Sequence, residues 1–163
     1  MMEPIRIFTA LDLEMAQPSQ KIIQIGAVVG DIQIEKVLDK ISLIVNPNEI
    51  LSPFIIQLTK IEQEDVDNGM DLISAYEEMT KFHKRYGSFC NVLSWGGGDV
   101  VEIKNQIKKY YPNYDLSNWA FGRRWVDVKT LFVSWRIAQG QPIQGGFART
   151  MTKVGLNFFG QKH

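Results

Sequence analysis

The order of apolar and polar residues predicts three strands within the first 45 residues. An apolar run at 5–11 is typical of a buried strand, and a second run at 22–29 is apolar on both faces. Gly30-Asp31 then predicts a hairpin turn. Alternation at 32–45, closed by the Asn-Pro-Asn of 46–48, predicts a third strand. Together these segments predict an antiparallel meander.

In most of the remaining chain, apolar residues recur at the spacing of an α-helix. Two short helices are expected at 53–58 and 63–66, and a long amphipathic one at 71–86. The apolar positions of this long helix are Leu72, Ala75, Tyr76, Met79, Phe82 and Tyr86. Farther along, short strands at 92–95 and 125–126 are each followed by a helix, at 99–110 and 127–138, and a last helix is expected after Gly145-Gly146, up to 154.

A three-strand meander followed by alternating helices and strands predicts an α/β fold of the ribonuclease-H-like kind. Such a fold has three layers, with helices on both faces of a mixed central sheet. The length of 163 residues suits one domain, and no internal repeat, low-complexity tract or interdomain linker interrupts it. We therefore predict a single domain over residues 1–163.

Composition adds bounds on location and charge. The one cysteine, Cys90, excludes an intramolecular disulfide framework and suits a reducing compartment; we expect it to be a buried strand residue. No apolar stretch is long enough to span a membrane, and no secretory signal region is recognised, which favours a cytoplasmic protein without a membrane partner. Because the formal net charge is zero, a polyanionic ligand would need a local site, where metal ions supply part of the positive charge.

The triplet Asp12-Leu13-Glu14 at the end of the first predicted strand is the main candidate for chemistry. Strand side chains alternate between faces, so Asp12 and Glu14 would leave the same face about 7 Å apart. Two adjacent carboxylates repel each other and lose solvation, whereas a divalent cation between them removes both penalties. Their hard oxygen atoms suit Mg²⁺ or Mn²⁺. Alternatively, the strand ends at Leu11 and both acids are solvated loop residues.

Asp99 is the second candidate, and a structural explanation competes with a functional one. It opens a predicted helix, and Glu102 follows at the spacing of a capping box. On the other hand, Gly96-Gly97-Gly98 would let the backbone approach a ligand, just beyond the end of an inner strand. Ligand clefts in open α/β folds lie beyond such strand ends. Spacing alone leaves the two explanations open.

Taken in order, these segments resemble the DEDD family of 3′→5′ exonucleases. Its first region is matched by the Asp12 triplet together with 22–27 and 58–61, its second by 94–99, and the approach to its third by 155–163. The segment 119–132 is similar to the corresponding part of the histidine-containing DEDDh branch, and within it of the Eri-1-like exoribonucleases. The similarity spans nearly the whole chain.

The resemblance implies two divalent cations, Mg²⁺ or Mn²⁺, held by four carboxylates. Asp12 would bridge both ions, Glu14 would hold the ion that activates water, and Asp99 would hold the other. His163 would take the proton from the attacking water as the general base. Family members release nucleoside 5′-monophosphates from 3′ ends and hold the terminal bases against apolar residues near the first motif. The matching positions are Leu13, Met15, Leu58 and Ile61; for Leu58 and Ile61 a plain core role is an equal alternative.

The sequence departs from this family at three places. Lys60 stands where a glycine is usual, and Gly96-Gly97-Gly98 replaces a bulky residue, which predicts a looser wall beside Asp99. The family's fourth carboxylate lies five residues beyond the histidine, whereas the sequence stops at His163. We therefore expect either a chain truncated just before the last catalytic Asp, or a protein that has lost one metal ligand.

Several other residues are weaker candidates. Phosphate contacts could come from Arg123, Arg124, Arg149 and Lys153, although protein surfaces carry such residues routinely. Asp127 is expected to cap a helix, with a polar role beside the cleft as the alternative, and His83 is expected to be a surface residue without a catalytic role. The four tryptophans are too scattered along the sequence to predict a stacking platform for single strands.

The sequence therefore predicts a metal-dependent 3′→5′ exonuclease that acts on single-stranded RNA or DNA 3′ ends, with RNA preferred by family analogy. One alternative is a catalytically impaired nucleic-acid-binding module of the same fold. Another is a phosphoesterase for dinucleotides and other short oligonucleotides.

Overall fold

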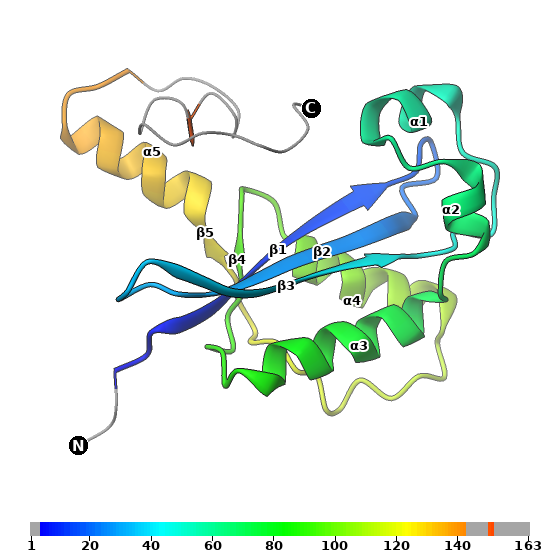
Figure 1. The fold of residues 1–163 in the computed structure, drawn as a ribbon, viewed down its shortest axis with the longest axis horizontal. Coiled ribbons are helices and arrows are strands. Elements are labelled where there is room, and N and C mark those ends of the chain that lie inside the picture. Colours follow the sequence, from blue (N-terminus) through cyan, green and yellow to red (C-terminus); the bar gives the residue numbers. More distant parts are fainter. Residues whose placement is uncertain (1–3, 143–149, 152–163) are drawn as a thin grey trace.

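A computed structural model describes residues 4–142, 150 and 151. Its centre is a five-stranded sheet in the order β3-β2-β1-β4-β5 (Figure 1). The strands are β1 (Ile7–Met15), β2 (Ile22–Asp31), β3 (Lys36–Ile44), β4 (Leu93–Ser94) and β5 (Val126–Asp127). The first three pair antiparallel, whereas β4 pairs parallel with β1 and β5 parallel with β4. The predicted mixed sheet is confirmed.

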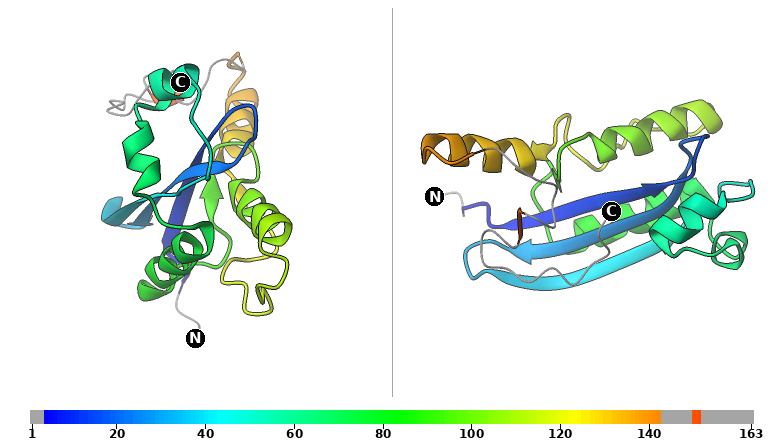
Figure 2. Two further views of the ribbon diagram at one scale, coloured as in Figure 1. Left: turned by 90° about the vertical axis from the view of Figure 1, so that its right-hand side faces the viewer. Right: turned by 90° about the horizontal axis from the view of Figure 1, so that it is seen from above.

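Five helices are defined within the described residues. They are α1 (Pro53–Thr59), α2 (Gln63–Asp67), α3 (Leu72–Arg85), α4 (Asp99–Tyr110) and α5 (Val128–Ala138). Figure 1 shows α3 and α4 on one side of the sheet, with α1 and α5 at opposite ends of its other side. Figure 2 shows the same layers from two further directions. The arrangement matches the expected ribonuclease-H-like α/β fold. None of these helices is both long and apolar enough to cross a membrane.

Two apolar cores hold the layers together. The larger one packs α3 and α4 against the sheet and includes Leu11, Ile25 and Val29 with Met79 and Ile103, which are buried to 3% exposure or less. The smaller one lies beneath α1 and α2 and consists of Ala16, Ile23, Leu51, Ile55, Ile61 and Val66. Apolar burial on this scale is the main favourable contribution to folding.

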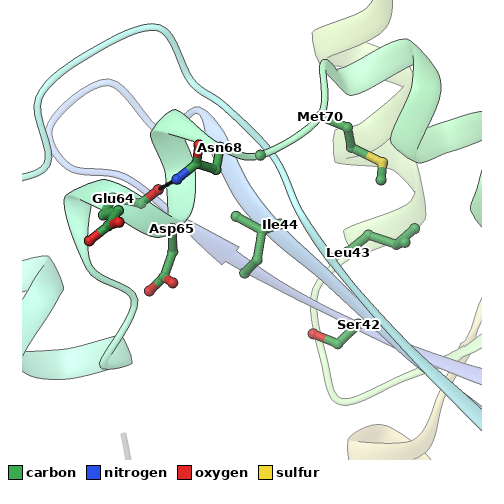
Figure 3. A pocket seen from close by; sticks show the side chains of 8 residues that line it. Ser42, Leu43, Ile44, Glu64, Asp65, Asn68 and Met70 are labelled. Carbon is green, nitrogen blue, oxygen red and sulfur yellow. Dashed lines mark hydrogen bonds between the residues drawn. The ribbon is translucent and has the colours of Figure 1, made fainter.

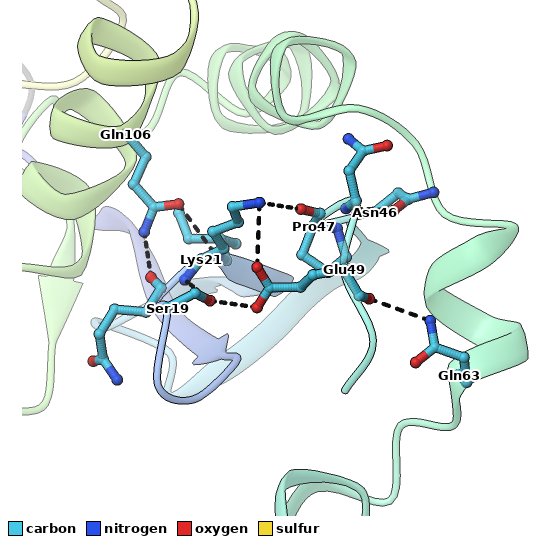
Figure 4. Close-up of polar contacts among 10 residues, drawn as sticks. Ser19, Lys21, Asn46, Pro47, Glu49, Gln63 and Gln106 are labelled. Atoms are coloured by element: carbon cyan, nitrogen blue, oxygen red, sulfur yellow. Dashed lines mark hydrogen bonds and ion pairs between the residues drawn. The ribbon is translucent and has the colours of Figure 1, made fainter. Parts of the chain in front are cut away.

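A polar network fixes the turn between β1 and β2 against α4 (Figure 4). The buried Gln106 side chain donates to the Gln20 carbonyl at 2.6 Å and accepts from the Ile22 amide at 3.0 Å. Lys21 donates to the Pro47 carbonyl at 2.7 Å and pairs with Glu49 at 3.2 Å. The C-terminal half of α4 is thereby tied to the β1–β2 turn and to the first residue of β2.

The structure corrects several expectations. The hairpin turn lies at residues 32–35 instead of at Gly30-Asp31, because β2 continues through both residues. Cys90 is exposed, since β4 begins only at Leu93. His83 is 3% exposed on α3 and so is a core residue, not a surface one. Of the last predicted helix, the structure describes only Thr150 and Met151, both helical; the rest lies outside the described residues.

Candidate active site

β1 carries Asp12 and Glu14 on one face of the sheet. The strand runs through Met15, so the alternative in which both acids belong to a loop is wrong. Asp12 is exposed and Glu14 half-buried. Gly26 pairs with Asp12 on the neighbouring strand. Paired residues share a face, and a glycine there leaves open space beside the Asp12 carboxylate.

The parallel pairing of β1 with β4 brings Asp99 to this place. Ala10 pairs with Leu93, so both strands end at the same edge of the sheet. The glycine loop follows β4, and α4 begins at Asp99 and contacts β1. Gly98 is the N-cap of α4, and no side chain caps this helix. The capping-box explanation of Asp99 is therefore wrong, and its carboxyl group is not used as a cap.

Asp99 is buried and close enough to Asp12 to be affected by its negative charge. Burial, and then the negative charge of Asp12, raise the pKa of Asp99 from 3.8 to about 7. A shift of this size marks two carboxylates that compete for one poorly solvated space. Perturbed carboxyl groups of this kind cluster at functional sites.

This pair of carboxylates fits a divalent cation. Hard oxygen donors without soft ligands suit Mg²⁺ or Mn²⁺, and a cation would relieve the repulsion that raises the Asp99 pKa. Asp12, Glu14 and Asp99 are the residues that would hold it. Within the described part of the chain, no three His, Cys, Asp or Glu side chains are gathered closely enough to form a metal group by themselves. Further ligands from water or substrate phosphate are usual for Mg²⁺.

The loop before Asp99 is held in a defined shape. Gly96 has a φ of +96°, a conformation that favours glycine. Its amide donates to Asp127 at 3.1 Å, and its carbonyl accepts from the Trp125 indole at 3.2 Å. The Ser94 hydroxyl donates to the Gly97 carbonyl at 2.8 Å. Asp127 is also the N-cap of α5, as predicted, because it accepts from the Thr130 amide at 3.0 Å.

A buried pair supports β1 from behind. The Thr9 hydroxyl and His83 Nδ1 are 2.8 Å apart, and both side chains are buried, at 0% and 3% exposure. Burial, and then the charge of Lys84, lower the pKa of His83 below 6.5, which favours the neutral imidazole. Thr9 points to the face opposite Asp12, so the pair ties β1 to α3 three residues before the carboxylate.

The residues that were predicted to contact bases pack in or against the two apolar cores. Ile61 is 5% exposed in the smaller core, and Leu58 packs against it. Leu13 and Met15 pack partly buried against the larger core. Lys60 adopts φ +61° at the C-cap of α1, so the turn usual for glycine is kept. Three other predicted site residues lie outside the part of the chain that the structure describes: Arg149, Lys153 and His163.

A hollow elsewhere on the molecule is distinct from this site (Figure 3). It measures about 390 Å³ and lies between β3 and α2, lined by Ser42, Leu43, Ile44, Glu64, Asp65, Asn68, Gly69 and Met70. Its charged residues are acidic, which disfavours a polyanion. None of Asp12, Glu14 and Asp99 lines it.

Sequence reasoning missed the supporting residues of the site except Asp127, for which a polar role beside the cleft was one alternative. Trp125 and Asp127 hold the glycine loop from about 30 residues away in sequence. The Thr9–His83 pair joins residues 74 positions apart. The only signal was the similarity of the segment 119–132 to a known family, which did not give these contacts.

Residues 9–90 of the sequence match the exonuclease family RNase T. That segment contains Asp12 and Glu14, and it ends before Asp99. A search of curated proteins finds no match.

Solved structures of nucleases share the fold. Cell-death related nuclease 4 (CRN-4) has a TM-score of 0.81 at 18% identity, over 98% of this chain and 58% of that one. The nuclease domain of 3′hExo, described as a DEDDh family member bound to rAMP, has a TM-score of 0.73 at 19% identity, over 98% and 84%. A 3′-exonuclease described with its recognition of the histone mRNA stem-loop has a TM-score of 0.73 at 18% identity, over 98% and 75%. The chain thus spans little more than half the length of CRN-4.

Proposed function

This chain belongs to the RNase T exonuclease family, and we propose that it is a metal-dependent 3′→5′ exonuclease acting on single-stranded RNA or DNA. The products would be nucleoside 5′-monophosphates. Asp12, Glu14 and Asp99 would carry the two divalent cations, Mg²⁺ or Mn²⁺.

The observation that carries this proposal is that the parallel pairing of β1 with β4 and the contact of α4 with β1 bring the buried Asp99 near Asp12, whose charge helps to raise its pKa. A protein gains nothing structurally from two carboxylates that oppose each other in a poorly solvated space. The same arrangement binds a cation well, because the ionised form of Asp99 then gains a counter-charge.

The remaining chemistry divides among residues of this chain. Bound divalent cations would lower the pKa of a water and stabilise negative charge on the phosphate. Asp12 and Asp99 would hold cations between β1 and α4, where the phosphodiester would bind. Glu14, two residues beyond Asp12 on the same face, would hold the cation on the side of the attacking water. The family resemblance assigns the general base to His163, whose imidazole would accept a proton from water near neutral pH.

Two observations support RNA as the first substrate to test. One structural neighbour is bound to rAMP, and another is described with its recognition of a histone mRNA stem-loop. Specificity belongs to a site and not to a fold, so DNA belongs in the same experiment.

The experiment is a product analysis with labelled single strands and Mn²⁺. We expect 5′-labelled RNA to shorten stepwise and to release 5′-mononucleotides, and a 3′-terminal phosphate to slow the reaction. Cuts in a circular strand, or shortening from the 5′ end, would contradict the proposed polarity. Binding of RNA without hydrolysis at any metal concentration would instead identify a catalytically impaired module, and hydrolysis of dinucleotides alone would identify a phosphoesterase for short substrates.

A further inference from the structure

An indole ring covers the glycine that precedes Asp99. A Cβ added to Gly98 would lie 3.3 Å from the outer ring carbon Cη2 of Trp125. At Gly98 the wall is therefore closed by Trp125 and Val101, whereas a Cβ added to Gly97 would meet nothing within 4 Å. The ring remains 36% exposed, and its indole N–H donates to the Gly96 carbonyl at 3.2 Å. One face of the candidate site is thus aromatic.

Further aromatic rings continue from this loop along α5. The ring centroids of Trp95 and Phe132 are 6.0 Å apart at 44°, and those of Phe132 and Trp135 are 6.0 Å apart at 33°. Trp135 is 52% exposed. We call Trp95, Trp125, Phe132 and Trp135 the aromatic strip. Phe132 thus joins the rings of Trp95 and Trp135, and Trp125 lies against the same glycine loop.

The segment that carries most of the strip is locally basic. Residues 119–141 contain four Lys or Arg residues and one acid, although the whole chain has zero net charge. The exposed Arg123 and Arg124 directly precede Trp125, and the stem of Lys129 packs 3.5 Å from the Cβ position of Gly96. The single acid, Asp127, is engaged by the Gly96 amide and Thr130. Arg136 is buried, whereas Arg123, Arg124 and Lys129 are exposed in the segment that also carries the exposed rings of Trp125 and Trp135.

We propose that the aromatic strip binds the bases of a single strand upstream of its 3′ terminus. Trp125 would contact a base beside the scissile phosphodiester, and Trp135 a base farther from the 3′ end. Stacking on exposed rings combined with backbone cations is how single strands are held without regard to sequence. The placement of the strand rests on the proposed function, whereas the binding surface itself does not.

The test is direct binding in EDTA, where metal-dependent hydrolysis is suppressed. Fluorescence anisotropy is measured with a labelled single-stranded 12-mer and a labelled dinucleotide of RNA. We expect Trp135→Leu to weaken 12-mer binding about 5-fold or more, since losing one stacked base costs at least this factor. Trp135→Phe keeps a ring and should stay within about 2-fold. The matched control is Leu131→Ala, an exposed apolar residue of the same helix, which should change nothing.

Binding of the dinucleotide distinguishes the role of Trp125 from that of Trp135. Its binding should be unaffected by Trp135→Leu but weakened by Trp125→Leu, because Trp125 packs on Gly98, the residue before Asp99. Circular dichroism checks that each variant is folded. If Trp135→Leu does not fold, the pair Trp125→Leu and Trp125→Phe carries the same comparison.

The outcomes distinguish this inference from the proposed function. Equal 12-mer binding by all variants would overturn the strip as a nucleic-acid surface, even if the wild type hydrolyses RNA. Loss of self-association in Trp135→Leu by sedimentation velocity, with RNA binding unchanged, would also overturn it and would identify a contact between copies. Weakened RNA binding in Trp135→Leu together with no hydrolysis by the wild type would support the strip and reject the exonuclease.

Discussion

Asp12 and Glu14 lie on one face of β1, where two acids repel each other when no cation is present. We expect Asp12→Ala and Glu14→Ala to lower exonuclease turnover on the order of 10²- to 10⁴-fold, the size of effect that several kcal/mol of transition-state stabilisation produces. In EDTA, thermal melting should show equal or higher stability than the wild type. Substantial activity in either variant would remove the metal site from the mechanism.

The titration of Asp99 should make the free energy of unfolding of the protein depend on pH. Its pKa is about 7 when folded and 3.8 without these surroundings, so the folded state binds the proton more tightly. The contribution of Asp99 to the free energy of unfolding is therefore fully present below about pH 4 and is lost as the pH rises through 7. We expect urea unfolding in EDTA to show this loss of stability between pH 5 and 8 in the wild type but not in Asp99→Asn. Asp12→Asn should remove only part of it, because burial, the larger cause, remains.

The Thr9–His83 pair makes a separate prediction. Thr9→Val leaves a buried imidazole nitrogen without its partner and should destabilise the protein by roughly 1–3 kcal/mol in urea unfolding. Adding His83→Leu should recover part of this loss, since both polar groups are then gone. The pKa of His83 is lowered, so its contribution is lost as pH falls below 6.5. An additive double mutant would contradict direct coupling between the two side chains.

At the scale of elements, an aspartate caps the N-terminus of both α3 and α5, but only the cap of α5 also contacts the loop before Asp99. Asp127 caps α5 and also holds the Gly96 amide, whereas Asp71 caps α3 by accepting from the Ile73 and Ser74 amides. Asp127→Ala and Asp71→Ala should each cost roughly 0.5–2 kcal/mol in stability. Only Asp127→Ala should also lower turnover, because only that cap shapes the loop before Asp99. Equal turnover in both variants would show that this loop needs no such support.

Most elements follow from the sequence because their patterns are local. Helix α4 was predicted at its observed bounds, and β1 to β3 within a few residues. The hairpin turn was misplaced because Gly30 and Asp31 still pair with β3. The contacts of the site could not be predicted in the same way. His83 was expected at the surface because its neighbours are Lys84 and Arg85, yet the helical turn directs it to Thr9.

On the scale of the whole molecule, the sheet topology assembles the site from distant segments. The motifs of β1 and α4 are 85 residues apart, and they meet because β4 lies parallel beside β1. The aromatic strip reaches the same loop through β5, the next strand of the sheet. The carboxylates and the strip are therefore arranged around one end of β4.

The most direct test of the central claim is a time course with Mn²⁺ on one 5′-labelled single strand of RNA. Wild type and Asp99→Asn are compared on a denaturing gel, with Asp115→Asn, an exposed acid outside the site, as the matched control. We expect stepwise shortening from the 3′ end by the wild type and by Asp115→Asn, its abolition by EDTA, and nearly complete loss in Asp99→Asn. Equal shortening by Asp99→Asn, or shortening that persists in EDTA, would contradict a metal-dependent exonuclease site built on Asp12, Glu14 and Asp99.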